Sequence, residues 1–240
     1  MKRIALVFVV WLYCAGAYSQ GLSAFTQKAD KFFKEYVSDG RVKYGAVASD
    51  FSQMTQLYEQ IGGMDLSASS DLEKKAFYIN SYNLIVVYQI AKYYEFHKKS
   101  PMDQSGFFDK MKHKVAGEMM TLNVLEIRKL LFAYKDARIH FVLACAAKSC
   151  PPLASFAYTP SGLEKQLENR TRLSINDNDW LKVSSKDNKV LLSKIFDWYK
   201  RDFTSDGQTV LGFINMYRKQ SIPASYQVAY YEYDWNLNSN

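Results

Sequence analysis

Cysteine and histidine are both scarce in this chain, with three of each among 240 residues. His97 and His113 lie among lysines, in segments that we expect to be exposed. Together with His140 they show none of the spacings that are typical of zinc ligands. The sequence therefore predicts no structural metal, and no motif in it indicates a cofactor.

Long apolar runs are also missing after the N-terminus. A membrane-spanning helix needs about 20 consecutive apolar residues, and no later segment reaches that length without a charge. The first apolar run, from Ile4 to about Tyr13, is shorter than this and follows the basic residues Lys2 and Arg3. We therefore expect no transmembrane segment and a soluble mature protein.

The first 19 residues have the pattern of a signal peptide, with a basic start, a short apolar run and small residues before a cut after Ser19. Cys14 raises the alternative of a lipid anchor. However, Tyr13 precedes it, where a lipoprotein peptidase generally requires a small residue. We predict that residues 1–19 are removed and that residues 20–240 form a periplasmic or secreted protein.

Nothing in the sequence divides the mature chain, which has no internal repeat, low-complexity tract or linker rich in proline and glycine. We expect one domain. The net charge of +7 would fall to +5 on removal of Lys2 and Arg3. The lysines are scattered among apolar residues, which favours a solvated basic face over nucleic-acid binding. Peripheral contact with an anionic envelope surface stays open.

Hydrophobic periodicity predicts an α+β domain that is rich in helix and packed on a small, mostly antiparallel sheet. The best-defined helix begins at Ser70, which has capping-box spacing to Glu73, and runs to about Tyr94. The other predicted helices cover residues 23–37, 48–61, 123–132, 161–173, 194–203 and 209–219. Strands are predicted at 138–146, in a hairpin of 180–183 with 189–192, and after residue 226.

Helical spacing places Asn80 and Asn83 on the apolar face of the 70–94 helix, opposite Lys74, Ser81 and Gln89 among others. A buried carboxamide without a partner costs about 1–3 kcal/mol. The two asparagines therefore need partners. These could be neighbouring backbone groups or a catalytic histidine that the asparagines orient.

The predicted strand 138–146 carries His140 and Cys145, which alternate to opposite faces because they are five residues apart. Cys150 lies beyond a turn, before two prolines, and could fold back toward His140. This arrangement allows a dyad of the kind that activates a cysteine nucleophile. The group that orients the histidine would be Asn80, Asn83 or Asp234.

The two cysteines of the mature chain have a second interpretation. An exported protein meets oxidising conditions, so Cys145 and Cys150 could instead form a disulfide across a short loop. His140 would then be a neutral core histidine. Thiol state separates the two interpretations, because a nucleophile must be free.

Other chemistry-bearing residues have structural explanations. Glu126 lies three residues after Asn123, which favours a helix-capping role over a catalytic one. The many tyrosines of the 70–94 helix, Tyr82 and Tyr88 among them, are more typical of helix packing than of a sugar platform.

Five stretches of this sequence resemble the family catalogued as domain of unknown function 547, and together they span about residues 73–238. The run IHF…C…KSCPPL is the most specific. The family often has a histidine after its glutamate, where this chain has Ile127. The stretches are KKAFYINSYNLIVVY, GEMMTLNVLEIRKLL, ARIHFVLACAAKSCPPL, LSKIFDWYKRDF and YDWNLN.

The resemblance implies an exported bacterial member with a shared helix-rich α+β fold, and it implies no activity. A helix packed on a small sheet with a strand histidine is reminiscent of papain-like and transglutaminase-like hydrolases, by analogy of fold alone. Two functions follow. The first is a cysteine-dependent hydrolase or transferase of an amide or peptide-like envelope substrate, with Cys150 as nucleophile and His140 as base. The second is a non-enzymatic binding or scaffold domain with a structural disulfide.

Overall fold

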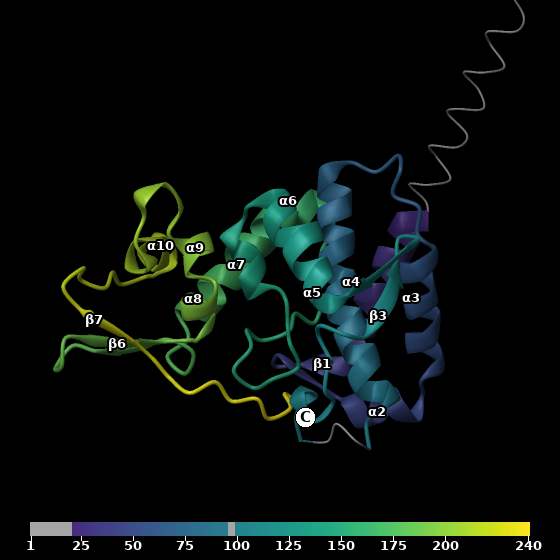
Figure 1. Cartoon of the computed structure of the whole chain (residues 1–240), viewed down its shortest axis with the longest axis horizontal. Coiled ribbons are helices and arrows are strands. Elements are labelled where there is room, and N and C mark those ends of the chain that lie inside the picture. The colour runs from purple at the N-terminus through teal and green to yellow at the C-terminus, as the bar shows by residue number, and fades with distance from the viewer. Residues whose placement is uncertain (1–20, 96–98) are drawn as a thin grey trace, which may run out of the picture.

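The structure, a computed structural model, describes residues 21–95 and 99–240 (Figure 1). The predicted signal peptide, Cys14 and His97 lie outside these residues. After a helix over residues 21–36, the α-helices are α2 Tyr44–Ser49, α3 Ser52–Gly63, α4 Asp71–Lys92, α5 Leu122–Val124, α6 Phe132–Tyr134, α7 Leu163–Ile175, α8 Ile195–Trp198, α9 Lys200–Phe203 and α10 Val210–Tyr217. The 3-10 turns are η1 Pro101–Asp103, η3 Ala137–Phe141, η4 Pro160–Gly162 and η5 Ser205–Gly207, and η2 Leu125–Leu131 is π-helical.

Within the described residues the strands form three small sheets, so the prediction of a helix-rich α+β fold with little sheet is confirmed. Two sheets are antiparallel hairpins, and the third joins an antiparallel hairpin to a parallel final strand. The first hairpin turns at Asp39 and Gly40, which both have positive φ, as is typical of an Asp-Gly hairpin turn. The strands are β1 Val37–Ser38, β2 Arg41–Val42, β3 Lys112–Val115, β4 Glu118–Thr121, β5 Lys182–Ser184, β6 Lys189–Leu192 and β7 Gln227–Tyr230.

Helix α4 is the central element of the N-terminal half, and its predicted capping box of Ser70 with Glu73 is confirmed. The expected polar side is wrong at Ser81 and Gln89, which are fully buried, whereas Lys74 is partly exposed as expected. The reason is that α2, α3, η2 and η4 all pack around α4, so between Ala76 and Ala91 only Tyr78 and Tyr88 are partly exposed. Gln89 is accommodated by donating to the carbonyl of Phe107.

Residues 138–146 do not form the predicted strand, which was wrong. They lie in η3 and in the irregular chain after it. The Asp136 side chain caps η3 by accepting from the Arg138 backbone and forms ion pairs with Arg138 and with the buried Lys75 of α4. The apolar run therefore reflects burial of a turn against α7 and η2, since periodicity alone does not distinguish buried strands from other buried segments.

The predicted start of the next helix was also misplaced. Thr121, and not Asn123, is the N-cap, because its hydroxyl accepts from the backbone N–H of Val124. The helix then widens into the π-helical turns of η2, and Glu126 lies inside it, away from the capping position. π-helical turns are rare and occur frequently at functional sites.

Two apolar clusters form the core. One surrounds α4, and the other lies beneath α8, α9 and α10, with Phe196, Phe203 and Phe213 at its centre. Figure 1 shows α2, α3 and α4 at one end of the molecule and β6, β7 and α10 at the other. Element η3 belongs to both clusters, because Ile139 packs in the first and Phe141 in the second.

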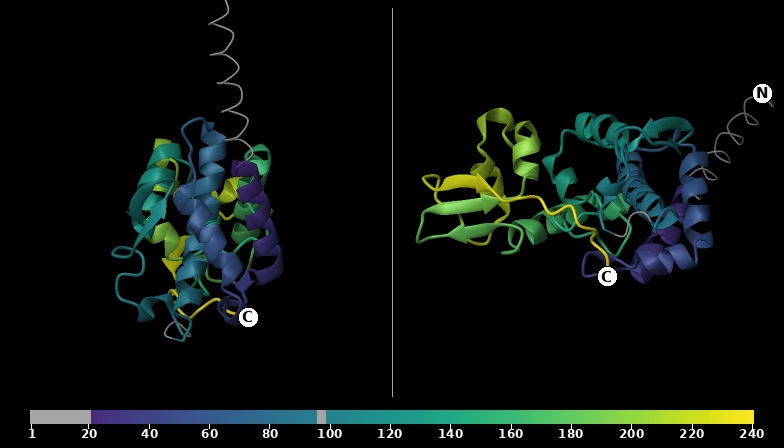
Figure 2. Two further views of the ribbon diagram at one scale, coloured as in Figure 1. Left: turned by 90° about the vertical axis from the view of Figure 1, so that its right-hand side faces the viewer. Right: turned by 60° about the horizontal axis from the view of Figure 1, so that its bottom comes forward.

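The C-terminal tail returns from β7 across the molecule to the N-terminal half (Figure 2). Backbone hydrogen bonds fasten Asn238 and Asn240 to Val42 of β2. The tail therefore holds the two halves together and passes close to the loop that contains the cysteines. Among the described residues, no helix is both long enough and apolar enough to cross a membrane.

Candidate functional site

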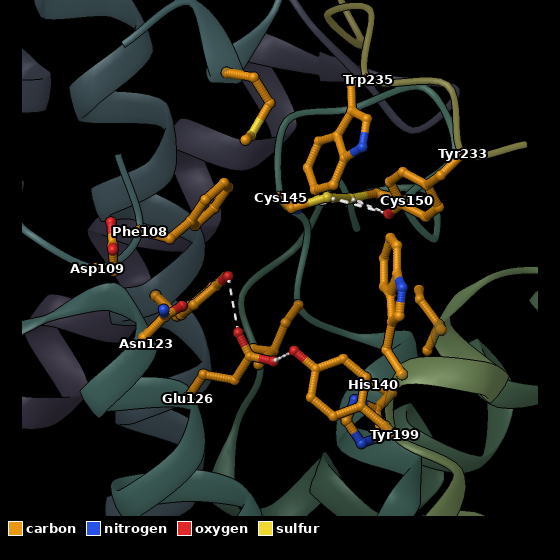
Figure 3. Close-up of a pocket in the computed structure, with 15 residues that line it drawn as sticks. Phe108, Asp109, Asn123, Glu126, His140, Cys145, Cys150, Tyr199, Tyr233 and Trp235 are labelled. Atoms are coloured by element: carbon orange, nitrogen blue, oxygen red, sulfur yellow. Dashed lines mark hydrogen bonds between the residues drawn. A yellow bond between two sulfur atoms is a disulfide. The ribbon is translucent and has the colours of Figure 1, made fainter. Parts of the chain in front are cut away.

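A cavity of about 450 Å³ lies between the N-terminal half, η3 and the C-terminal tail (Figure 3). Phe108, Asp109 and Asn123 stand on one side of it, and Tyr233 and Trp235 stand on the other. Its lining comes from segments far apart in the sequence, which only the folded chain brings together. The remaining lining residues are Tyr82, Met102, Glu126, His140, Leu143, Cys145, Cys150, Ile195, Trp198 and Tyr199.

Glu126 occupies the floor of this cavity, held by two tyrosine hydroxyls. Tyr82 of α4 donates to one carboxylate oxygen at 3.2 Å, and Tyr199 donates to the other at 2.8 Å. The pKa of each tyrosine is raised well above its ordinary value, mainly by burial and then by the charge of Glu126. Both hydroxyls therefore stay protonated and remain donors, and the capping role expected for Glu126 was wrong.

His140 lines the same cavity, but its partner is neither cysteine nor asparagine. Its Nε2 lies 2.8 Å from Oδ2 of Asp202, and its ring packs against Tyr199 with centroids 4.3 Å apart. Asp202 orients the histidine, and sequence reasoning missed it. Its only signal was its position in the family-like segment LSKIFDWYKRDF, which contains four other charged side chains of equal promise.

Cys145 and Cys150 are joined by a disulfide, with their Cα atoms 6.1 Å apart. The Tyr233 hydroxyl donates to both sulfurs at 3.2 Å, and the backbone N–H of Cys145 points to the sulfur of Cys150 at 2.9 Å. Cys145 and His140 line the same cavity. The expectation that strand geometry would separate them was therefore wrong, because there is no strand there.

Asn80 and Asn83 face inward as predicted, and both bind backbone instead of His140. The Asn80 carboxamide donates to the carbonyl of Tyr158 and accepts from its N–H, each at 2.8 Å. Asn83 donates to the carbonyl of Val142 at 2.8 Å and accepts from the N–H of Ala144 at 2.9 Å. Of the two alternatives left open for them, the backbone one holds.

Asp234, the third candidate to orient His140, has a structural role as well. Its side chain accepts from the backbone and the carboxamide of Asn236, and its backbone N–H donates to the hydroxyl of Ser149 at 2.8 Å. It thereby fastens the C-terminal tail to the turn that precedes Cys150. This contact places Tyr233 and Trp235 over the cavity.

The tail and α8 together form an aromatic wall of Trp198, Tyr233 and Trp235. Tyr233 lies 4.9 Å from Trp198 and 4.8 Å from Trp235 between ring centroids, and the two indoles are 6.1 Å apart. Trp198 is 51% exposed although it is a large apolar side chain. A ligand in the cavity would cover this surface.

Glu126 and Asp109 are the two acidic residues of the lining. Neither lysine nor arginine is among the described lining residues. No group of three or more His, Cys, Asp or Glu side chains in residues 21–95 and 99–240 is arranged to hold a metal ion.

His113 lies outside this cavity and is buried against Tyr58, with its Nδ1 2.8 Å from the tyrosine hydroxyl. Its expected exposure was therefore wrong.

Comparison with known proteins adds a family and no activity. No curated protein and no solved structure matches the chain. Residues 64–173 match the model of a family described as "Protein of unknown function, DUF547". This segment supplies Tyr82, Glu126, His140 and both cysteines, whereas the aromatic wall and Asp202 follow it. Ile127, where the family often has histidine, is half exposed outside the cavity. The resemblance to the DUF547 family is therefore confirmed over residues 64–173.

Proposed function

We propose that this protein is an exported, non-enzymatic binding domain for a peptide-like or other envelope ligand, which occupies the cavity over Glu126. The observation that carries this proposal is the Cys145–Cys150 disulfide in the cavity wall. A bridged cysteine has no thiolate to attack a substrate. The cavity nevertheless has the size and the mixed apolar and polar lining of a ligand site.

Tryptophan fluorescence tests this proposal, since Trp198 and Trp235 both line the cavity. Titration of the unreduced protein with a mixture of tripeptides should change the emission. The same peptides should be recovered intact by mass spectrometry after long incubation. The response should be reduced in Trp198→Ala, a change at a half-exposed side chain that should leave the fold intact. Cleaved peptides in the unreduced protein would contradict a non-enzymatic function.

Export is part of the proposal. A stable disulfide belongs in an oxidising compartment, and the N-terminal residues have the pattern of a signal peptide. Mass spectrometry of the protein from the periplasm or medium should find Gln20 as the first residue and no lipid on Cys14. An intact precursor in the cytoplasm would contradict export.

A second candidate function is the cysteine-dependent hydrolase or transferase, in a reduced state of the protein. One observation favours it: Cys150 and His140 line the same cavity. His140 is in turn hydrogen-bonded to Asp202. After reduction these three residues would be nucleophile, base and orienting group. Cys150 in the reduced protein should then react with iodoacetamide faster than an ordinary thiol. Both His140→Ala and Asp202→Asn should slow that reaction, and equal rates in all three proteins would exclude this function.

A further inference from the structure

We infer that the cavity binds a cationic alkylammonium group, such as a lysine side chain of a peptide-like ligand, between the Glu126 carboxylate and the aromatic wall. This inference deepens the proposed binding function and rests on it. Three features of the cavity carry it: the sign of its charge, the state of its hydrogen-bond donors and the arrangement of its rings.

The charge of the cavity is opposite to that of the protein. The chain as a whole carries a formal +7, yet the cavity is lined by the carboxylates of Glu126 and Asp109 without lysine or arginine among the described lining residues. Glu126 is half-buried, where water screens its charge less than it does at the surface. A ligand cation would therefore find an uncompensated negative charge, and an anion would be repelled.

The donors of the cavity are largely engaged within the protein. The Tyr82 and Tyr199 hydroxyls donate to Glu126, and the Tyr233 hydroxyl donates to the disulfide sulfurs. These three groups are thus not aimed at a ligand carboxylate or phosphate. Glu126 receives one hydrogen bond on each oxygen, and a carboxylate has about four acceptor sites. It can therefore accept further bonds from an ammonium group.

The aromatic wall supplies the second half of a cation site. A cation within about 6 Å of an aromatic ring centroid is attracted to the face of the ring, and tryptophan is the strongest of these partners. Trp198, Tyr233 and Trp235 lie within 4.8–6.1 Å of one another and edge the same cavity as Glu126. Figure 3 shows Tyr233 and Trp235 across the open space from Phe108, with Glu126 at its floor. An alkyl chain would lie in this open space, between Phe108 and the aromatic wall.

Calorimetric titration with three matched probes tests the inference on the full unreduced protein. The probes are Nα-acetyl-lysine methylamide, its Nε-trimethyl form and its Nε-acetyl form, of which only the last is neutral. Both cations should bind at least tenfold more tightly than the neutral probe. Glu126→Gln keeps the size and the acceptor oxygen of the side chain and should weaken the cations at least tenfold. Trp198→Ala should weaken chiefly the trimethyl probe.

The control variant is Glu118→Gln, the same substitution at an exposed carboxylate that pairs with Lys129 outside the cavity. It should bind all three probes as the unaltered protein does. Equal binding of the neutral and charged probes, or full cation binding by Glu126→Gln, would overturn the charge inference and leave the binding function in place. If no probe binds while the tripeptide mixture still changes the tryptophan emission, the lysine-type ligand is excluded. If neither is observed, the binding function fails with it.

Discussion

The side chains of Asn80 and Asn83 form the hydrogen bonds in the core that backbone groups would form in a strand or helix. Each carboxamide satisfies one N–H and one carbonyl of irregular chain that no strand or helix pairs. Asn83 binds the segment that leads from His140 to Cys145, so it fixes the cavity wall without touching a ligand.

Replacing either asparagine with leucine should lower the free energy of unfolding by about 1–3 kcal/mol for each backbone group that loses its partner, and each substitution leaves two such groups unpaired. Chemical denaturation of each variant measures this loss. Gln27→Leu, on an exposed helical surface, serves as the control and should change stability by less than about 0.5 kcal/mol. Unchanged stability of both asparagine variants would contradict the hydrogen bonds described.

His113 gives the protein a pH-dependent stability. Burial, followed by the charge of Lys92, lowers the pKa of His113 from 6.5 to about 4. Between these pH values the unfolded chain binds more protons than the folded one. Stability should therefore be full above pH 6.5 and fall as the pH drops to about 4, by on the order of 3 kcal/mol.

Denaturation curves of the unaltered protein and of His113→Leu, recorded from pH 7 to pH 4, isolate this contribution. The variant should lose less stability over that range, whatever its stability at pH 7. Parallel pH profiles for the two proteins would show that the histidine is not held neutral.

Single residues were predictable where burial alone decided their role. The inward direction of Asn80 and Asn83 follows from helical spacing, and the proximity of Cys145 to Cys150 follows from the short loop. Asp202 was not predictable, because its contact with His140 spans 62 residues and depends on how α9 packs beneath η3. The carboxylate of Glu126 was misassigned since a local capping pattern explained it without tertiary contacts.

At the level of elements, the start of the helix that carries Glu126 is the feature most open to test. Thr121 caps it, so Thr121→Ala should destabilise the protein by about 1 kcal/mol. Asn123 was the expected cap, and Asn123→Ala should change stability by less than half as much. Thermal or chemical denaturation of both variants decides the question, and the reverse order would restore the capping-box interpretation.

Elements with strong local signals were predicted well, and those defined by tertiary contacts were not. The capping box of α4 and the hairpin of β5 and β6 are local features, and both form. Residues 138–146 are apolar enough for a strand. They cannot pair as one because Asp136 caps a turn there and Asn83 takes the backbone groups that follow.

At the scale of the whole molecule, η3 links the two apolar clusters through Ile139 and Phe141. Phe141→Ala should lower the free energy of unfolding by about 3–5 kcal/mol, because the side chain is fully buried. If the halves are coupled as the packing indicates, calorimetry should still show one transition, at a lower temperature. Two separate transitions in the unaltered protein would contradict a single cooperative domain.

The binding function rests on the state of two cysteines, and peptide mapping of protein purified without reductant measures that state directly. Trypsin cuts after Arg138, Lys148 and Lys165, so each cysteine falls in a different peptide. With iodoacetamide present throughout, the account predicts peptides 139–148 and 149–165 joined by a disulfide, with neither cysteine alkylated. Alkylated Cys150 in a separate 149–165 peptide, from protein that was folded when labelled, would contradict it.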